Sequence, residues 1–83
     1  MTEKDFYIWA GRKMRELREK VGETQSELSK KTGIDRTLIS KFENTGKKVS
    51  AFRIKQMLEA MGYSLGDLTD EKNLSISSSM LPA

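Results

Sequence analysis

Apolar residues recur at helical spacing in two stretches of the chain. In the first, which runs from Thr2 to about Val21, they follow one another at steps of four, four, three and four residues: Phe6, Ala10, Met14, Leu17 and Val21. In the second, from Ala51 to Met61, the spacing links Ile54, Met57, Leu58 and Met61. Such a stripe lies on one face of a helix and is buried against a core. The pattern therefore predicts two amphipathic helices, each followed by a glycine that favours its end.

The segment between them predicts two short helices joined by a tight turn. Thr24 and Glu27 have the spacing of a capping box, and Asp35 can cap a second helix. Gly33 suits the turn because glycine accepts a positive φ without strain. The two helices are expected at about 25–32 and 36–44, the second with an apolar back formed by Ile39 and Phe42. This arrangement is a helix-turn-helix motif, whose second helix enters the major groove in proteins that bind DNA.

The remainder of the chain predicts one more element and a tail. Ser64 and Asp67 form another capping pair, so a short fifth helix is expected from Leu65 to about Glu71. A β-strand at 63–68 is the alternative, although glycine and aspartate suit strands poorly. From Asn73 the sequence NLSISSSMLPA is serine-rich and uncharged. We therefore expect one domain over 1–72 and a flexible tail over 73–83.

Composition removes several classes of function. The 83 residues include no cysteine and no histidine, which excludes disulfides, zinc sites built on these residues and Ser-His-Asp catalysis. The acidic residues show no pairing typical of general acid–base work, so we expect no enzyme, no catalytic residue, no metal and no cofactor. No apolar run is long enough to span a membrane or to form a signal peptide. The expected location is the cytoplasm.

Charge is distributed unevenly along the chain. The net charge is +3, but residues 1–48 hold twelve basic against eight acidic residues (+4), and residues 49–83 hold three against four (−1). The basic half contains the helix-turn-helix, as expected of a surface that meets phosphates. A solvated helical surface explains the charge alone equally well.

The front of the second helix carries the side chains that could read bases. Arginine matches the two acceptors of guanine, and leucine can meet a thymine methyl group. The residues expected at base edges are Arg36, Thr37, Leu38 and Lys41. Those expected at phosphates, from the first turn of the preceding helix to the loop after the reading helix, are Gln25, Ser40, Asn44, Lys47 and Lys48. Solvated surface is the alternative for all of them, and Leu38 could equally belong to the core.

The run from Gly11 to Leu68 resembles the Cro/C1-type helix-turn-helix family, also called XRE. The resemblance is carried by the Arg-Glu-Leu-Arg run at 15–18, Thr24-Gln25, Leu28, Gly33, Ile39 and Glu43-Asn44. It implies an all-α, compact five-helix, lambda-repressor-like bundle with the helix-turn-helix at helices 2–3. It also implies an ion pair between Arg18 and Glu43, and a homodimer on an operator with an inverted repeat.

The function implied is that of a sequence-specific DNA-binding transcriptional regulator, a repressor. The subtype stays open between the antitoxin of a toxin–antitoxin pair and a prophage or restriction-linked regulator. Residues 24–44 are particularly similar to HipB-like antitoxins, which bind a toxin protein, and the chain also resembles small phage repressors. The alternative from another class is a protein-interaction adaptor that uses Trp9 and the tail. Apolar residues after the fourth helix are expected to form the dimer interface: Tyr63, Leu65 and Leu68. RNA binding is disfavoured because no aromatic lies on the expected reading face.

Overall fold

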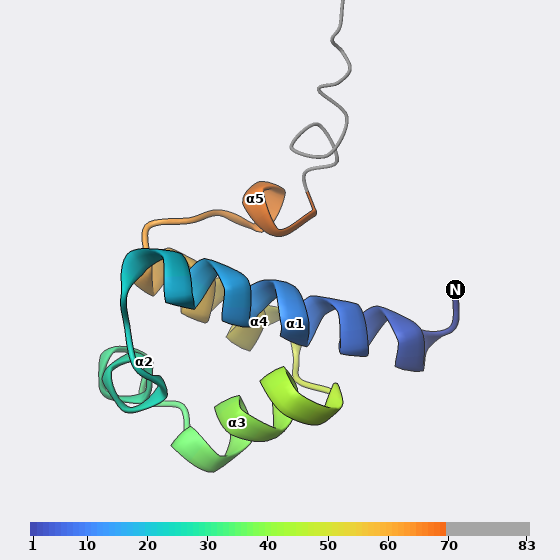
Figure 1. Cartoon of the computed structure of the whole chain (residues 1–83), viewed down its shortest axis with the longest axis horizontal. Helices are drawn as coiled ribbons and strands as arrows, with labels where there is room; N and C mark the ends of the chain where they lie inside the picture. The colour runs from blue at the N-terminus through green and yellow to red at the C-terminus, as the bar shows by residue number, and fades with distance from the viewer. Residues whose placement is uncertain (70–83) are drawn as a thin grey trace, which may run out of the picture.

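The computed structural model describes residues 1–69, which form five α-helices around one core (Figure 1). The helices are α1 (Glu3–Val21), α2 (Gln25–Thr32), α3 (Arg36–Thr45), α4 (Ala51–Ala60) and α5 (Leu65–Thr69). The expected all-α, five-helix bundle is confirmed, and the strand considered at 63–68 is wrong. The expected end of the fifth helix at Glu71 and the tail at 73–83 lie outside the described residues.

Local capping explains where the helices begin. Thr2 and Thr24 each complete a capping box with the acidic residue three positions later, at the starts of α1 and α2. The side chains of Asp35 and Ser50 accept hydrogen bonds from the first turns of α3 and α4. Each cap satisfies a backbone N–H that has no partner within its helix. The helix starts therefore follow directly from short polar residues in the sequence.

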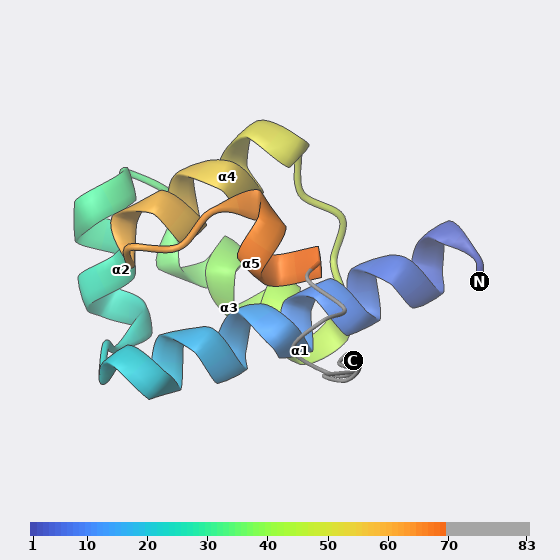
Figure 2. The same cartoon turned by 90° about the horizontal axis from the view of Figure 1, so that it is seen from above.

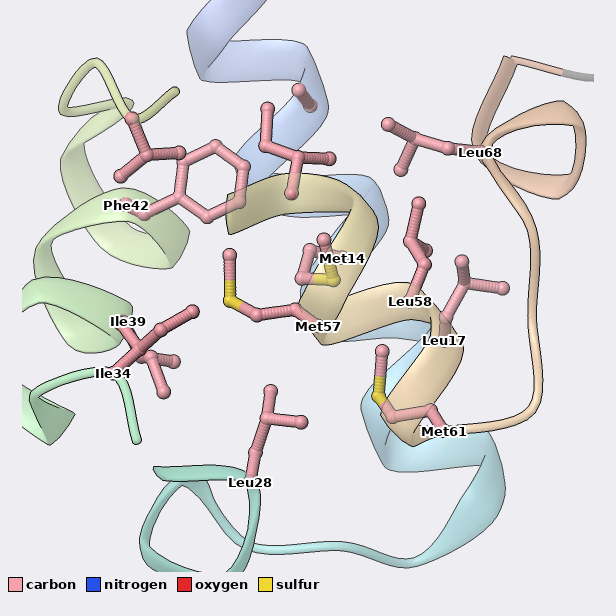
Figure 3. Close-up of a cluster of buried hydrophobic side chains, with 13 residues drawn as sticks. Met14, Leu17, Leu28, Ile34, Ile39, Phe42, Met57, Leu58, Met61 and Leu68 are labelled. Carbon is pink, nitrogen blue, oxygen red and sulfur yellow. The ribbon is translucent and has the colours of Figure 1, made fainter. Parts of the chain in front are cut away.

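The core collects side chains from all five helices (Figure 3). The largest fully buried side chains are those of Phe42, Met14, Leu28, Ile39, Met57, Leu58 and Leu68. The whole predicted stripe of α4 is buried. The stripe of α1 is buried at its centre, but Phe6 is only partly buried and Val21 is 42% exposed. The prediction for Val21 was wrong because this residue ends α1, where the helix has passed the edge of the core.

Helix α1 is the longest element and lies between α3 and α5 (Figure 1). Its first turns project past the rest of the bundle (Figure 2). The contact with α3 is unusually close: a Cβ atom added to Gly11 would lie 1.9 Å from the carbonyl oxygen of Phe42. Only a residue without a side chain allows this approach of two helix backbones. The position of α3 is thus set by α1 on one side and by α2 on the other.

Candidate nucleic-acid interface

The turn between α2 and α3 is fixed by polar contacts as well as by packing. Gly33 has φ +77°, a left-handed conformation that glycine adopts without strain. The hydroxyl of Ser29 donates a hydrogen bond to the carbonyl oxygen of Ile34 at 2.5 Å, and Ile34 is buried. The carboxylate of Asp35 accepts a hydrogen bond from the backbone of Thr37. These contacts hold the start of α3 at a defined angle to α2.

Helix α3 has a buried back and an exposed polar front. Ile39 and Phe42 are fully buried, whereas the front residues Arg36, Thr37, Lys41 and Asn44 are exposed. Ser40 is half-buried, and its hydroxyl accepts a hydrogen bond from the side-chain amide of Asn44. The expected base and phosphate positions of α3, apart from Leu38, are thereby brought to one accessible face.

Leu38 differs from the other front residues. It is half-buried and packs against the hydrophobic core. The structure therefore uses Leu38 for packing, in line with the alternative that its sequence position left open.

Basic side chains surround this face. Arg36, Lys41 and Lys47 form no ion pair with a carboxylate among the described residues, so their charges are open to a phosphate. Lys48 instead lies 3.0 Å from the carboxylate of Glu3, at the start of α1. The hydrogen bond to Glu3, aided by its negative charge, holds the pKa of Lys48 above its ordinary value. Both side chains are exposed, so this is a weak pair that solvent screens.

The buried ion pair that anchors α3 involves Arg18 and Glu43. The Arg18 guanidinium donates two hydrogen bonds to the Glu43 carboxylate, each 2.9 Å long. Its third contact is the backbone carbonyl oxygen of Glu23, at 2.6 Å. The two side chains are 10% and 0% exposed. The hydrogen bonds to Glu43 hold the pKa of Arg18 above its ordinary value, although burial opposes this shift. The end of α1 is thus tied to the end of α3.

Gln25 extends this cluster to the start of α2. Its side-chain amide donates a 3.0 Å hydrogen bond to the carboxylate of Glu43, which therefore accepts three side-chain hydrogen bonds. Nothing in the sequence spacing identified this third partner. The amide nitrogen of Gln25 is engaged with Glu43, and its side-chain oxygen can only accept hydrogen bonds. A phosphate at this end of α2 would therefore be held by the free backbone N–H groups of the first turn.

The residues expected at a dimer interface do not share one environment. Leu65 is 42% exposed and Tyr63 is half-buried. Leu68 is only 2% exposed and packs in the core of its own chain (Figure 3). The expectation for Leu68 is corrected on this point, because a side chain that fills the core of one chain is not available to a second. Helices α5 and α3 lie on opposite sides of α1 (Figure 1).

Other kinds of site find little support within residues 1–69. No group of three acidic, histidine or cysteine side chains there could hold a metal ion. Across the same residues, no helix combines the length and the apolar character needed to cross a membrane.

Comparison with known proteins finds one family model that matches the central segment of the chain. The family model described as helix-turn-helix matches residues 14–68, which extend from the middle of α1 almost to the end of α5. The match contains all of α2, the turn and α3. No curated protein and no solved structure shows significant similarity to the chain.

Proposed function

Since the chain belongs to the Cro/C1-type helix-turn-helix (XRE) family of DNA-binding transcription regulators, we propose that it is a sequence-specific repressor that binds an inverted repeat as a homodimer. The observation that carries this proposal is the exposed polar front of α3, held on a buried apolar back and anchored by Arg18 and Glu43. A rigid helix with accessible polar side chains is what reading of base edges requires.

The roles of individual residues follow from their chemistry and exposure. Arg36 and Thr37 occupy the exposed first turn of α3, where recognition helices contact base edges, and Lys41 lies about one turn further along. Lys47, Lys48, Asn44 and Ser40 would hold the DNA backbone, together with the start of α2 at Gln25. The base contacts would set the sequence preference, and the phosphate contacts would set the register and the salt dependence.

Dimer formation would use the exposed surface around α5. Tyr63 and Leu65 are the apolar side chains that remain accessible there. In dimers of this kind two reading helices enter successive major grooves, with half-sites about 34 Å apart. Sedimentation of the chain with a selected duplex measures this directly: two chains per duplex are expected, and one chain per duplex would remove the dimer from the proposal.

The antitoxin subtype of this proposal rests on the resemblance of the sequence pattern at residues 24–44 to HipB-like antitoxins. Its partner would be a kinase-like toxin encoded beside this chain, whereas a phage-type repressor has no such partner. Co-expression with the neighbouring reading frame, followed by purification of the complex, separates the two subtypes. A stable complex supports the antitoxin, and separate elution supports the phage-type regulator.

The roles of base and phosphate contacts are tested with matched variants on a duplex recovered by selection. Arg36→Ala should weaken specific binding by about 1–3 kcal/mol and relax the preference at one base pair. Lys47→Ala should weaken binding to all sequences alike and reduce the salt slope by about one. Lys55→Ala, an exposed lysine on α4, serves as the control. Equal losses on all sequences for Arg36→Ala and Lys47→Ala would contradict base reading by Arg36.

A further inference from the structure

An apolar hollow opens beside the first turns of α1, next to the end of α5. Its volume is about 260 Å³, and it is lined by Met1, Phe6, Trp9 and Thr69. The rings of Phe6 and Trp9 contact each other, with centroids 5.9 Å apart. None of the side chains of these lining residues is charged. The hollow is therefore a place where the described part of the chain leaves apolar surface open to water.

DNA binding gives this hollow no role. Three lining residues precede residue 14, where the family match begins, and Thr69 directly follows its end at residue 68. Helix α5, whose end adjoins the hollow, also lies on the opposite side of α1 from α3 (Figure 1). A phosphate would find no basic side chain among the lining residues. The occupant should instead be an uncharged segment with apolar side chains.

Beyond the charged residues Asp70, Glu71 and Lys72, the chain continues from the rim of the hollow with such a segment. Thr69 lines the hollow and is the last described residue, so residues 70–83 start at this point. From residue 73 onward the sequence carries no charge, and its large apolar side chains are Leu74, Ile76, Met80 and Leu81. An uncharged side chain enters an apolar hollow without the cost of stripping water from an ion.

Distance and tethering favour the nearest two of these side chains. Leu74 is five residues beyond Thr69, a span of up to about 17 Å in an extended chain. Leu74 and Ile76 are two positions apart, so they share one face of an extended segment. Because this segment is tethered at the rim, its effective concentration there is on the order of millimolar. A contact too weak to hold a free peptide is sufficient under these conditions.

We propose that the hollow is the docking site of this chain's own segment 73–76, with Leu74 and Ile76 packed against Phe6 and Trp9. The docked segment covers aromatic surface that the five helices leave open. Residues 77–83, which begin with three serines, lie outside the proposed contact. This docking is independent of DNA binding.

Trp9 is the sole tryptophan of the chain, so its fluorescence reports on the hollow. The test uses the full-length chain with Leu74→Ser and Ile76→Ser combined. The matched control combines Met80→Ser and Leu81→Ser, which removes two apolar side chains from the same tail. Acrylamide quenching and the emission maximum are measured for each, and circular dichroism verifies that the helices are retained.

The first variant should shift Trp9 emission to longer wavelength and increase its quenching, and the control should match the unmodified chain. These differences should stay constant on dilution, because the segment docks within its own chain. No change in the first variant, or an equal change in the control, would overturn the assignment of segment 73–76. A difference that disappears on dilution would overturn docking within one chain, since it would mean that the tail comes from a second copy.

Discussion

Breaking the ion pair between Arg18 and Glu43 should release the end of α3 from α1. The informative perturbation is a double-mutant cycle with Arg18→Met and Glu43→Gln. Arg18→Met removes two of the three side-chain hydrogen bonds to the Glu43 carboxylate and leaves only that from Gln25. The Glu43 side chain is 0% exposed in the native structure. In the Arg18→Met variant its carboxylate would therefore be charged, buried and largely without partners.

The structure sets the expected magnitudes. Removing one member of a buried pair costs about 3–5 kcal/mol, and Arg18→Met should lie in this range. Glu43→Gln keeps the shape of the side chain but removes its charge, which should cost about 1–3 kcal/mol. The double variant carries neither charge, so its cost should fall below the sum of the single costs by about 1–3 kcal/mol. The net contribution of the intact pair is smaller than any of these values, because burial of both ions offsets much of their attraction.

Denaturant unfolding of the four proteins at one pH measures the coupling energy. The control cycle is Arg15→Met with Glu19→Gln, which breaks an exposed ion pair 3.1 Å long on α1. Its coupling should be only about 0.3–0.5 kcal/mol. Coupling at Arg18 and Glu43 no larger than in the control would refute the reasoning, since it would mean that the buried geometry gives the pair no special weight.

Three further outcomes follow from the structure. Gly11→Ala should destabilise the fold by about 1–3 kcal/mol in the same unfolding assay, because the new Cβ would collide with the backbone of Phe42. The control is Gly66→Ala, because a Cβ at that position meets no atom closer than 3.5 Å. Hydrogen bonds from Thr24 hold the pKa of Glu27 below its ordinary value of 4.5, so the stability that this carboxylate contributes is present above that value and is lost as the pH falls through the lowered pKa. Urea unfolding across the acidic range should therefore show the difference between Glu27→Gln and the unmodified chain shrinking at low pH. Glu3→Gln should free Lys48 and strengthen DNA binding at low salt, with Glu16→Gln as the control; unchanged binding would show that the pair with Glu3 does not compete with phosphate.

Much of the fold was predictable because the signals are local. The capping boxes at Thr2 and Thr24 and the left-handed Gly33 each depend on residues within one helical turn. Amphipathic spacing identified the buried face of α4 for the same reason, since periodicity alone decides which side of a helix is apolar. These features required no knowledge of how the helices pack together.

The features that could not be predicted depend on tertiary contacts. Val21 continues the apolar stripe of α1, but the core ends before this residue is reached. Leu68 is an apolar residue of the kind found at interfaces, but it is buried in the core of its own chain. The pairing of Lys48 with Glu3 joins residues from opposite ends of the domain's first half. The sequence around each of these residues contains no signal for such contacts, because the contacts form only when the helices pack together.

Selection from a pool of random DNA duplexes tests the central claim most directly. If α3 reads base edges as half of a two-fold dimer, the pool should converge on an inverted repeat with half-sites about 34 Å apart. Selection with Arg36→Ala should recover the same repeat with a relaxed preference at one position of each half-site. Recovery of no preferred sequence by the unmodified chain would contradict the account.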